Sequence, residues 1–171
     1  MKNIILTGFM GTGKTETGLK LSQKLNCHFV DIDLVVEEME NRKIVDIFLE
    51  KGEDYFRKLE TSAIKEVLKK EGQVISTGGG ALLKEENRTL LKEAGVLICL
   101  SASPEEIFRR VGSGEGRPLL EGDDPLDKIR RILAERREIY NQVPYNISTD
   151  RKNSEEVVEK IVILLKKLRV I

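Results

Sequence analysis

One stretch near the start of the chain carries a complete pattern for holding phosphate groups. Residues 8–15 read GFMGTGKT, which fits G-x-x-x-x-G-K-[ST] at the end of an apolar strand and the start of a helical segment. The glycines let the backbone curl so that several N–H groups point at one anion, and the helix N-terminus adds about half a positive charge. Lys14 would neutralise phosphate oxygens, and Thr15 would offer a hydroxyl to Mg²⁺. The stretch therefore predicts a P-loop for a nucleoside triphosphate.

A P-loop alone leaves the phosphoryl acceptor open among water, a nucleotide and a small metabolite. The sequence has no N-K-x-D motif, which a guanine-specific switch protein would use. The apolar stretches ending near residues 76 and 100 are not followed by the acidic pair expected of a motor or assembly ATPase. Both observations favour a small acceptor molecule.

Two carboxylates follow the second apolar stretch, in the tripeptide Asp31-Ile32-Asp33. If the strand continued through them, both side chains would share one face, because residues two apart point the same way. At a strand end near the P-loop, one could support Mg²⁺ through water and the other could take a proton from an acceptor hydroxyl. The alternative is that Asp33 only caps the following helix.

Two arginines and a glutamate fall where a helix would face the protein core. Arg136 interrupts an apolar stripe at positions 126, 129, 133 and 140, and a guanidinium there needs a buried anion. Glu60 lies on or beside an inward helix face, three residues after Arg57. Either Arg57 and Glu60 form a structural ion pair, or Glu60 orients Arg57 so that it and Arg136 hold a substrate carboxylate.

Two glycine-rich stretches have both functional and plain structural interpretations. The run 78–80 follows the third strand; it could present backbone N–H groups to a ligand, or it could be a tight turn. Residues 112–122 hold four glycines around Arg117, and their composition predicts a mobile loop. Arg117 could close on a transferring phosphate, or it could be an ordinary solvated arginine.

The elements that position these residues alternate along the chain, which predicts an α/β fold with a mainly parallel sheet. Asp124-Pro125 and Asn153 with Glu156 are helix-start signals. Near-continuous apolar runs indicate strands that are buried on both faces. The expected strands cover 3–7, 29–32, 73–76, 96–100 and 145–148.

Composition narrows the class of protein further. The 171 residues suit a single domain, and 40% hydrophobic residues are enough for one core. Equal numbers of basic and acidic residues, 29 each, disfavour nucleic acid as a partner. The chain has no apolar run of membrane-spanning length and no signal peptide, so we expect no membrane contact and a cytoplasmic location. Cys27 and Cys99 are far apart, which favours structural thiols.

Together these residues resemble the shikimate kinase family. The shared pieces run in the family's order along nearly the whole chain: GFMGTGKT, DID, YFRKLE, STGGG, RR at 109–110, GRPLL and AERR. The resemblance implies a three-layer α/β/α P-loop kinase resembling nucleoside-monophosphate kinases. Such a fold has a five-stranded parallel sheet, a mobile lid at about 112–122 and a substrate-binding helical region at about 33–61 within a single domain over 1–171.

The resemblance also implies roles on the nucleotide side, with ATP as co-substrate and Mg²⁺ as cofactor. Arg110 would lie against one face of adenine. On the other face the family often has a proline, and the corresponding residue in this chain is Ser154. Arg117 would reach over the phosphates from the lid. Thr15 and Asp31 would support Mg²⁺. The residues around the phosphates would be Gly11, Thr12, Gly13, Lys14, Thr15 and Glu16. A small hydroxyl residue would suit position 16 better, so the Glu16 carboxylate must point away.

On the acceptor side, the resemblance implies that Asp33 binds the ring hydroxyls of shikimate and acts as the base. Arg57 and Arg136 would clamp the shikimate carboxylate, and Gly79 would contact the substrate through its backbone. Lys14 and Arg117 would stabilise the transferring group. The implied reaction moves the ATP γ-phosphoryl group to the 3-hydroxyl of shikimate, a step toward chorismate, in a monomer. The alternatives are another small-metabolite kinase, such as a gluconate kinase, and an inactive nucleotide-binding regulator.

Overall fold

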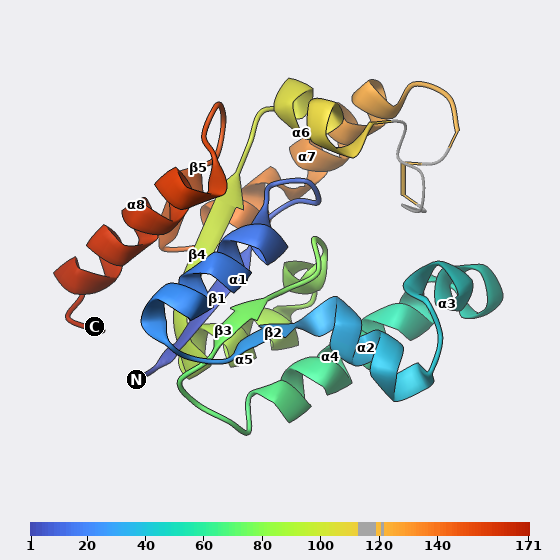
Figure 1. Cartoon of the computed structure of the whole chain (residues 1–171). Helices are drawn as coiled ribbons and strands as arrows, with labels where there is room; N and C mark the ends of the chain where they lie inside the picture. Colours follow the sequence, from blue (N-terminus) through green and yellow to red (C-terminus); the bar gives the residue numbers. More distant parts are fainter. Residues whose placement is uncertain (113–118, 121) are drawn as a thin grey trace.

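The computed structural model describes residues 1–112, 119–120 and 122–171, and its strands form one parallel sheet in the order β2-β3-β1-β4-β5 (Figure 1). The strands are β1 (Asn3–Thr7), β2 (Phe29–Asp31), β3 (Val74–Ser76), β4 (Gly95–Ser101) and β5 (Tyr145–Ser148). The α-helices are α1 (Lys14–Leu25), α2 (Ile32–Glu40), α3 (Ile44–Lys51), α4 (Glu53–Val67), α5 (Glu85–Ala94), α6 (Pro104–Val111), α7 (Pro125–Asn141) and α8 (Ser154–Lys167); a short 3₁₀ turn, η1, covers Ala81–Leu83.

The central strand β1 is buried on both faces, which explains its unbroken apolar sequence. Ile4 and Leu6 belong to one apolar cluster with residues of α1 and α8. Ile5, on the other face, belongs to a second cluster with residues of α4, α5 and α7. The molecule therefore has three layers, with the sheet between two groups of helices (Figure 1). The α/β fold and the five-stranded parallel sheet expected from the sequence are confirmed.

Two helix starts follow the signals in the sequence. The Asn153 side chain accepts from the N–H of Glu156 at 2.9 Å while the Glu156 carboxylate accepts from the N–H of Asn153, a reciprocal capping box. The Asp124 side chain caps α7, which has Pro125 at its first position. None of the described helices is long and apolar enough to cross a lipid bilayer.

The junction between β2 and α2 differs from the expectation. We expected a strand through Ile32 with Asp31 and Asp33 on one strand face, but β2 ends at Asp31 and Asp33 already lies in the first turn of α2. The cap is Asp31, whose Oδ1 accepts from the N–H of Asp33 at 3.0 Å, so the alternative with Asp33 as the cap is also wrong. The carboxylate of an aspartate can satisfy an otherwise unpaired helix N–H, and this favours an early helix start.

The segment between β2 and β3 is largely helical. Helices α2, α3 and α4 connect β2 to β3 and lie together on one side of the molecule (Figure 1). They coincide with the helical region expected at about 33–61. Most of the loop expected at 112–122, with Arg117, lies outside the described residues. Leu120 is described and fully buried.

The packing of α8 gives a matched test of the fold. Ile161 is fully buried in the apolar cluster with β1, whereas Ile163 is 54% exposed on the same helix. We expect Ile161→Ala to lower the free energy of unfolding by about 2–5 kcal/mol, because it removes buried methylenes and leaves a cavity. Ile163→Ala should change it by less than about 0.5 kcal/mol. Urea unfolding of both variants measures this, and equal effects would contradict the packing of α8.

Candidate active site

The P-loop adopts a curled conformation that side chains would block. Gly8 has φ 134°, and a Cβ atom there would lie 2.1 Å from the carbonyl oxygen of Leu100. Gly13 has φ 87° and is the N-cap of α1, and no side chain among the described residues caps the helix start by a hydrogen bond. Lys14 is buried, and its Nζ donates to the carbonyl oxygen of Phe9 at 2.8 Å. The loop therefore leaves the amides at the start of α1 open to an anion.

Among the described residues at least three cavities border this loop, and two of them are lined by several of the predicted site residues. The first, which we call the α2–α4 cavity, has a volume of about 560 Å³ and reaches the loop at Met10. The second, the α8 cavity, has a volume of about 380 Å³ and reaches the loop at Thr12 and Gly13. The α2–α4 cavity is lined mainly by α2, α3, α4, the glycine run 78–80 and Arg136 of α7. The P-loop thus borders both spaces, as a group transferred from one ligand to another requires.

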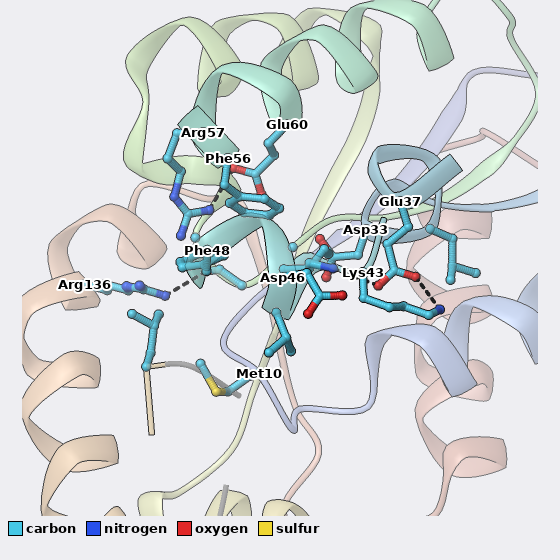
Figure 2. A pocket seen from close by; sticks show the side chains of 17 residues that line it. Met10, Asp33, Glu37, Lys43, Asp46, Phe48, Phe56, Arg57, Glu60 and Arg136 are labelled. Carbon is cyan, nitrogen blue, oxygen red and sulfur yellow. Dashed lines mark hydrogen bonds and ion pairs between the residues drawn. The ribbon is translucent and has the colours of Figure 1, made fainter. Parts of the chain in front are cut away.

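A buried ion pair lies in the wall of the α2–α4 cavity (Figure 2). Nη1 of Arg57 donates to Oε2 of Glu60 at 2.8 Å, and Nη2 donates to Oε1 of Glu53 at 3.1 Å. Glu60 is fully buried, and burial raises the pKa of its carboxyl although the nearby Arg57 and Arg136 charges oppose the shift. The ion pair expected from the sequence is present, and it fixes Arg57 at the cavity; that Arg57 and Arg136 hold a substrate carboxylate stays a prediction.

Arg136 reaches the same cavity from α7 (Figure 2). Its guanidinium carbon lies 5.7 Å from the ring centroid of Phe9, and Nη1 donates to the carbonyl oxygen of Gly79 at 3.3 Å. The hydroxyl of Tyr140, one turn further along α7, donates to the same carbonyl at 2.5 Å. Arg136 and Tyr140 together therefore fix the main chain at Gly79.

The glycine run leaves room for charged side chains to approach the backbone. A Cβ on Gly80 would lie 2.3 Å from Nη2 of Arg57. A Cβ on Gly78 would lie 2.6 Å from Oε1 of Glu60 and 2.8 Å from Oδ1 of Asp33. Both of these oxygens are buried without a hydrogen-bond partner among the described residues. Such acceptors indicate a missing donor, as the hydroxyl of a ligand would be.

Asp33 combines this lack of a partner with a strongly altered acidity. Burial raises the pKa of its carboxyl to about 7, and the negative charges of Asp31 and Glu60 act in the same direction. The positive charges of Lys14 and Arg57 partly oppose them. A carboxyl whose pKa lies near neutrality is suited to proton transfer at physiological pH.

Beside Asp33, the structure joins the two residues expected to support a metal ion. Oγ1 of Thr15 donates to Oδ2 of Asp31 at 2.8 Å, although the two residues belong to different elements. A hydroxyl and a carboxylate are oxygen donors of the kind that Mg²⁺ prefers. Among the described residues no group of three or more His, Cys, Asp or Glu side chains gathers as a metal site. Mg²⁺ commonly takes its remaining ligands from phosphates and water.

The α8 cavity holds the other residues expected around a nucleotide. Arg110 lines it and bridges two elements, donating to the carbonyl oxygen of Gly11 at 3.2 Å and to that of Thr149 at 2.8 Å. Ser154 lines the same cavity, as does Glu16, whose carboxylate accepts a hydrogen bond from the Ser154 hydroxyl.

The structure brings together most of the predicted site residues. Asp33, Arg57, Gly79 and Arg136 line one cavity, and Thr12, Gly13, Glu16 and Arg110 line the other. Arg117 lies outside the described residues. The sequence did not indicate roles for Phe9, which packs against Arg136, or for Tyr140, which binds Gly79. The position of Tyr140 on the apolar stripe, four residues after Arg136, was the one sequence signal that could have pointed to it.

The fold and the two-cavity site define a P-loop phosphotransferase. Comparisons with known proteins narrow the class. The shikimate kinase family model matches residues 10–166. A shikimate kinase from Thermoanaerobacter pseudethanolicus is 44% identical over 95% of each chain, and one from Sulfurihydrogenibium is 42% identical over 98% of this chain and 99% of that one. The chain therefore belongs to the shikimate kinase family, as the resemblance in its motifs implied.

Solved structures agree with this assignment. Shikimate kinase from Acinetobacter baumannii, solved in complex with shikimate, matches with a TM-score of 0.95 and 33% identity over 100% of this chain and 96% of that one. The enzyme from Aquifex aeolicus matches with a TM-score of 0.84 and 40% identity over 96% of each chain. A gluconokinase from Sinorhizobium meliloti, at 18% identity and a TM-score of 0.62, shares the fold alone over 98% of this chain and 93% of that one.

The acidity of Asp33 predicts how stability depends on pH. Its pKa is about 7 in the folded protein, above the ordinary value of 3.8. Between these two pH values the unfolded chain has lost the proton that the folded protein keeps, so rising pH costs the folded state stability. We expect Asp33→Asn to remove this cost, so that the variant's stability relative to wild type grows by up to about 4 kcal/mol from pH 4 to pH 8.

Urea unfolding at several pH values measures the difference. The control is Asp54→Asn, on the exposed face of α4, which reports the general effect of losing one carboxylate. If the Asp33→Asn gain does not vary with pH, the Asp33 carboxyl is not buried as described.

Proposed function

We propose that this chain transfers the γ-phosphoryl group of ATP to the 3-hydroxyl of shikimate, giving shikimate 3-phosphate and ADP. Shikimate is a ring acid with hydroxyl groups. The observation that carries the proposal is the α2–α4 cavity beside the P-loop, which combines two guanidinium groups with Asp33, whose Oδ1 is buried and has no donor among the described residues. Family membership supports the same reaction.

The arginines would bind the acceptor's carboxylate. Arg57 and Arg136 come from different helices and line one cavity, so two forked donors can approach one carboxylate from two sides. Glu60 holds Arg57, and Phe9 packs against the Arg136 guanidinium. The substrate would meet charges that are already positioned, which lowers the entropic cost of binding. Gly79, which lines the same cavity, would contact it through the backbone.

Asp33 would accept the proton of the reacting hydroxyl. As the O–H bond breaks, the proton moves to the Asp33 carboxylate and the acceptor oxygen forms a bond to the γ-phosphorus. The bond from that phosphorus to the β,γ-bridging oxygen breaks, and ADP leaves. Lys14 and Arg117 would stabilise the negative charge on the transferring group, and most of the rate would come from positioning and electrostatics.

The nucleotide would occupy the other side of the loop. Backbone amides of residues 11–16 would hold the phosphates, and Arg110 of the α8 cavity would lie against adenine. Thr15 and Asp31 would hold Mg²⁺, which when bound would neutralise charge on the phosphates. We further propose that the protein acts as a cytoplasmic monomer on small molecules, without nucleic acid or membrane partners.

An ADP-release assay with and without shikimate tests the proposal. We expect ADP formation to depend on shikimate, because Asp33 and the two arginines suit a ring acid with hydroxyl groups. We expect that gluconate will not replace it, and a panel of acceptor acids separates the two kinases. Turnover with gluconate alone would favour the related metabolite kinase. ATP binding in calorimetry with no turnover on any acceptor would favour an inactive regulator.

Removing one arginine should mainly weaken acceptor binding. We expect Arg136→Ala to raise the KM for shikimate about 10- to 100-fold, because charge-assisted hydrogen bonds of this kind contribute about 1.5–3 kcal/mol. The KM for ATP should stay near the wild-type value. Arg131→Ala, on the exposed face of the same helix, is the control. Steady-state kinetics decide the matter: an unchanged KM for shikimate would remove Arg136 from the clamp.

The proposed metal site predicts a change in magnesium requirement. Asp31→Asn keeps an oxygen that can cap α2 but removes a negative charge, so we expect the Mg²⁺ concentration for half-maximal activity to rise about tenfold. A Mg²⁺ titration at fixed ATP measures it, with Asp54→Asn as the control. The same requirement in wild type and variant would show that Asp31 does not support the metal ion.

A further inference from the structure

A negatively charged side chain lies in the wall of the cavity where we place the nucleotide. Glu16 is in the first turn of α1, directly after Thr15, and lines the α8 cavity with Thr12 and Gly13. Its side chain is 66% exposed. A free carboxylate at this position would repel the phosphates that the P-loop gathers, since like charges in a cleft disfavour binding.

The structure holds this carboxylate against α8. The Ser154 hydroxyl donates to Oε1 of Glu16 at 2.5 Å, and Nζ of Lys20 lies 3.1 Å from the same oxygen. Lys20 also donates to Oγ of Ser154 and pairs with Glu155. All four side chains line the α8 cavity. Lys20 is therefore the positive centre of a group that joins the helix after the P-loop to the start of α8.

We propose that Lys20 is a positioning residue for nucleotide binding: it neutralises Glu16 and, through Ser154, keeps that carboxylate turned toward α8 and away from the phosphates. The proposal rests on the nucleotide site proposed above. It gives a physical account of the Glu16 carboxylate beside the P-loop, because Glu16 and Ser154 are in direct contact. Lys20 acts through Glu16 and needs no contact with ATP.

A neighbouring ion pair separates this role from simple attachment of α8. Lys24, one turn further along α1, pairs with Glu159 of α8, and neither residue lines the α8 cavity. Lys24→Met therefore removes a link between the same two helices without exposing a charge to the nucleotide. If Lys20 served only to attach α8, both lysine substitutions would act alike.

The test is a double-mutant cycle on Lys20 and Glu16, read by calorimetric Kd of Mg-ATP and by KM for ATP. We expect Lys20→Met to weaken ATP binding about threefold at low salt and less at high salt, because the charges are partly exposed and screened. The KM for shikimate should not move. In the Glu16→Gln background, Lys20→Met should have a clearly smaller effect, since only the Glu155 charge then remains unpaired. Lys24→Met should leave ATP binding unchanged.

Each other outcome overturns the proposal in a recognisable way. If Lys20→Met weakens ATP binding equally in both backgrounds, Lys20 does not act through Glu16 but through Glu155 or on the nucleotide directly. No change in either background would mean that Glu16 does not affect binding, and an equal loss in Lys24→Met would reduce the group to a link between helices. Because calorimetry needs no acceptor, ATP binding without shikimate turnover would defeat the proposed function while still testing this inference.

Discussion

The fully buried carboxylate of Glu60 constrains the residues around it in the α2–α4 cavity. A charge without solvent needs a close partner, and Arg57 supplies it at 2.8 Å. That contact places the Arg57 guanidinium so close to Gly80 that any side chain at position 80 would clash with it. The other Glu60 oxygen points toward Gly78 and Asp33. One buried charge thus explains the glycine run, the orientation of an arginine and part of the altered acidity of Asp33.

The fold could be predicted from the sequence because its signals are local. The apolar strands, the P-loop and the caps at Asp124 and Asn153 each depend on a few neighbouring residues. The error at Asp31 and Asp33 has a local cause as well: a strand continuation and a helix cap compete for the same three residues. Strand periodicity pointed to the first, and the capping hydrogen bond decided for the second.

The site was harder to predict where its contacts join distant segments. The sequence indicated that Arg136 and Glu60 were out of place in apolar stripes, but not which partners they had. The glycine run suggested exposed amides, whereas its clearest structural role is to make space for the side chains of Arg57, Glu60 and Asp33. Tyr140 resembled an ordinary core residue until its hydroxyl was found on Gly79. Such pairings follow from the tertiary arrangement, which no single segment specifies.

Because the P-loop borders separate cavities, the residues that line the α2–α4 cavity and the α8 cavity come from different parts of the chain. The P-loop joins β1 to α1, while the α2–α4 cavity is lined mainly by the insertion between β2 and β3, with the glycine run 78–80 and Arg136 of α7. A lineage can therefore exchange its acceptor by altering the insertion while the donor machinery stays intact.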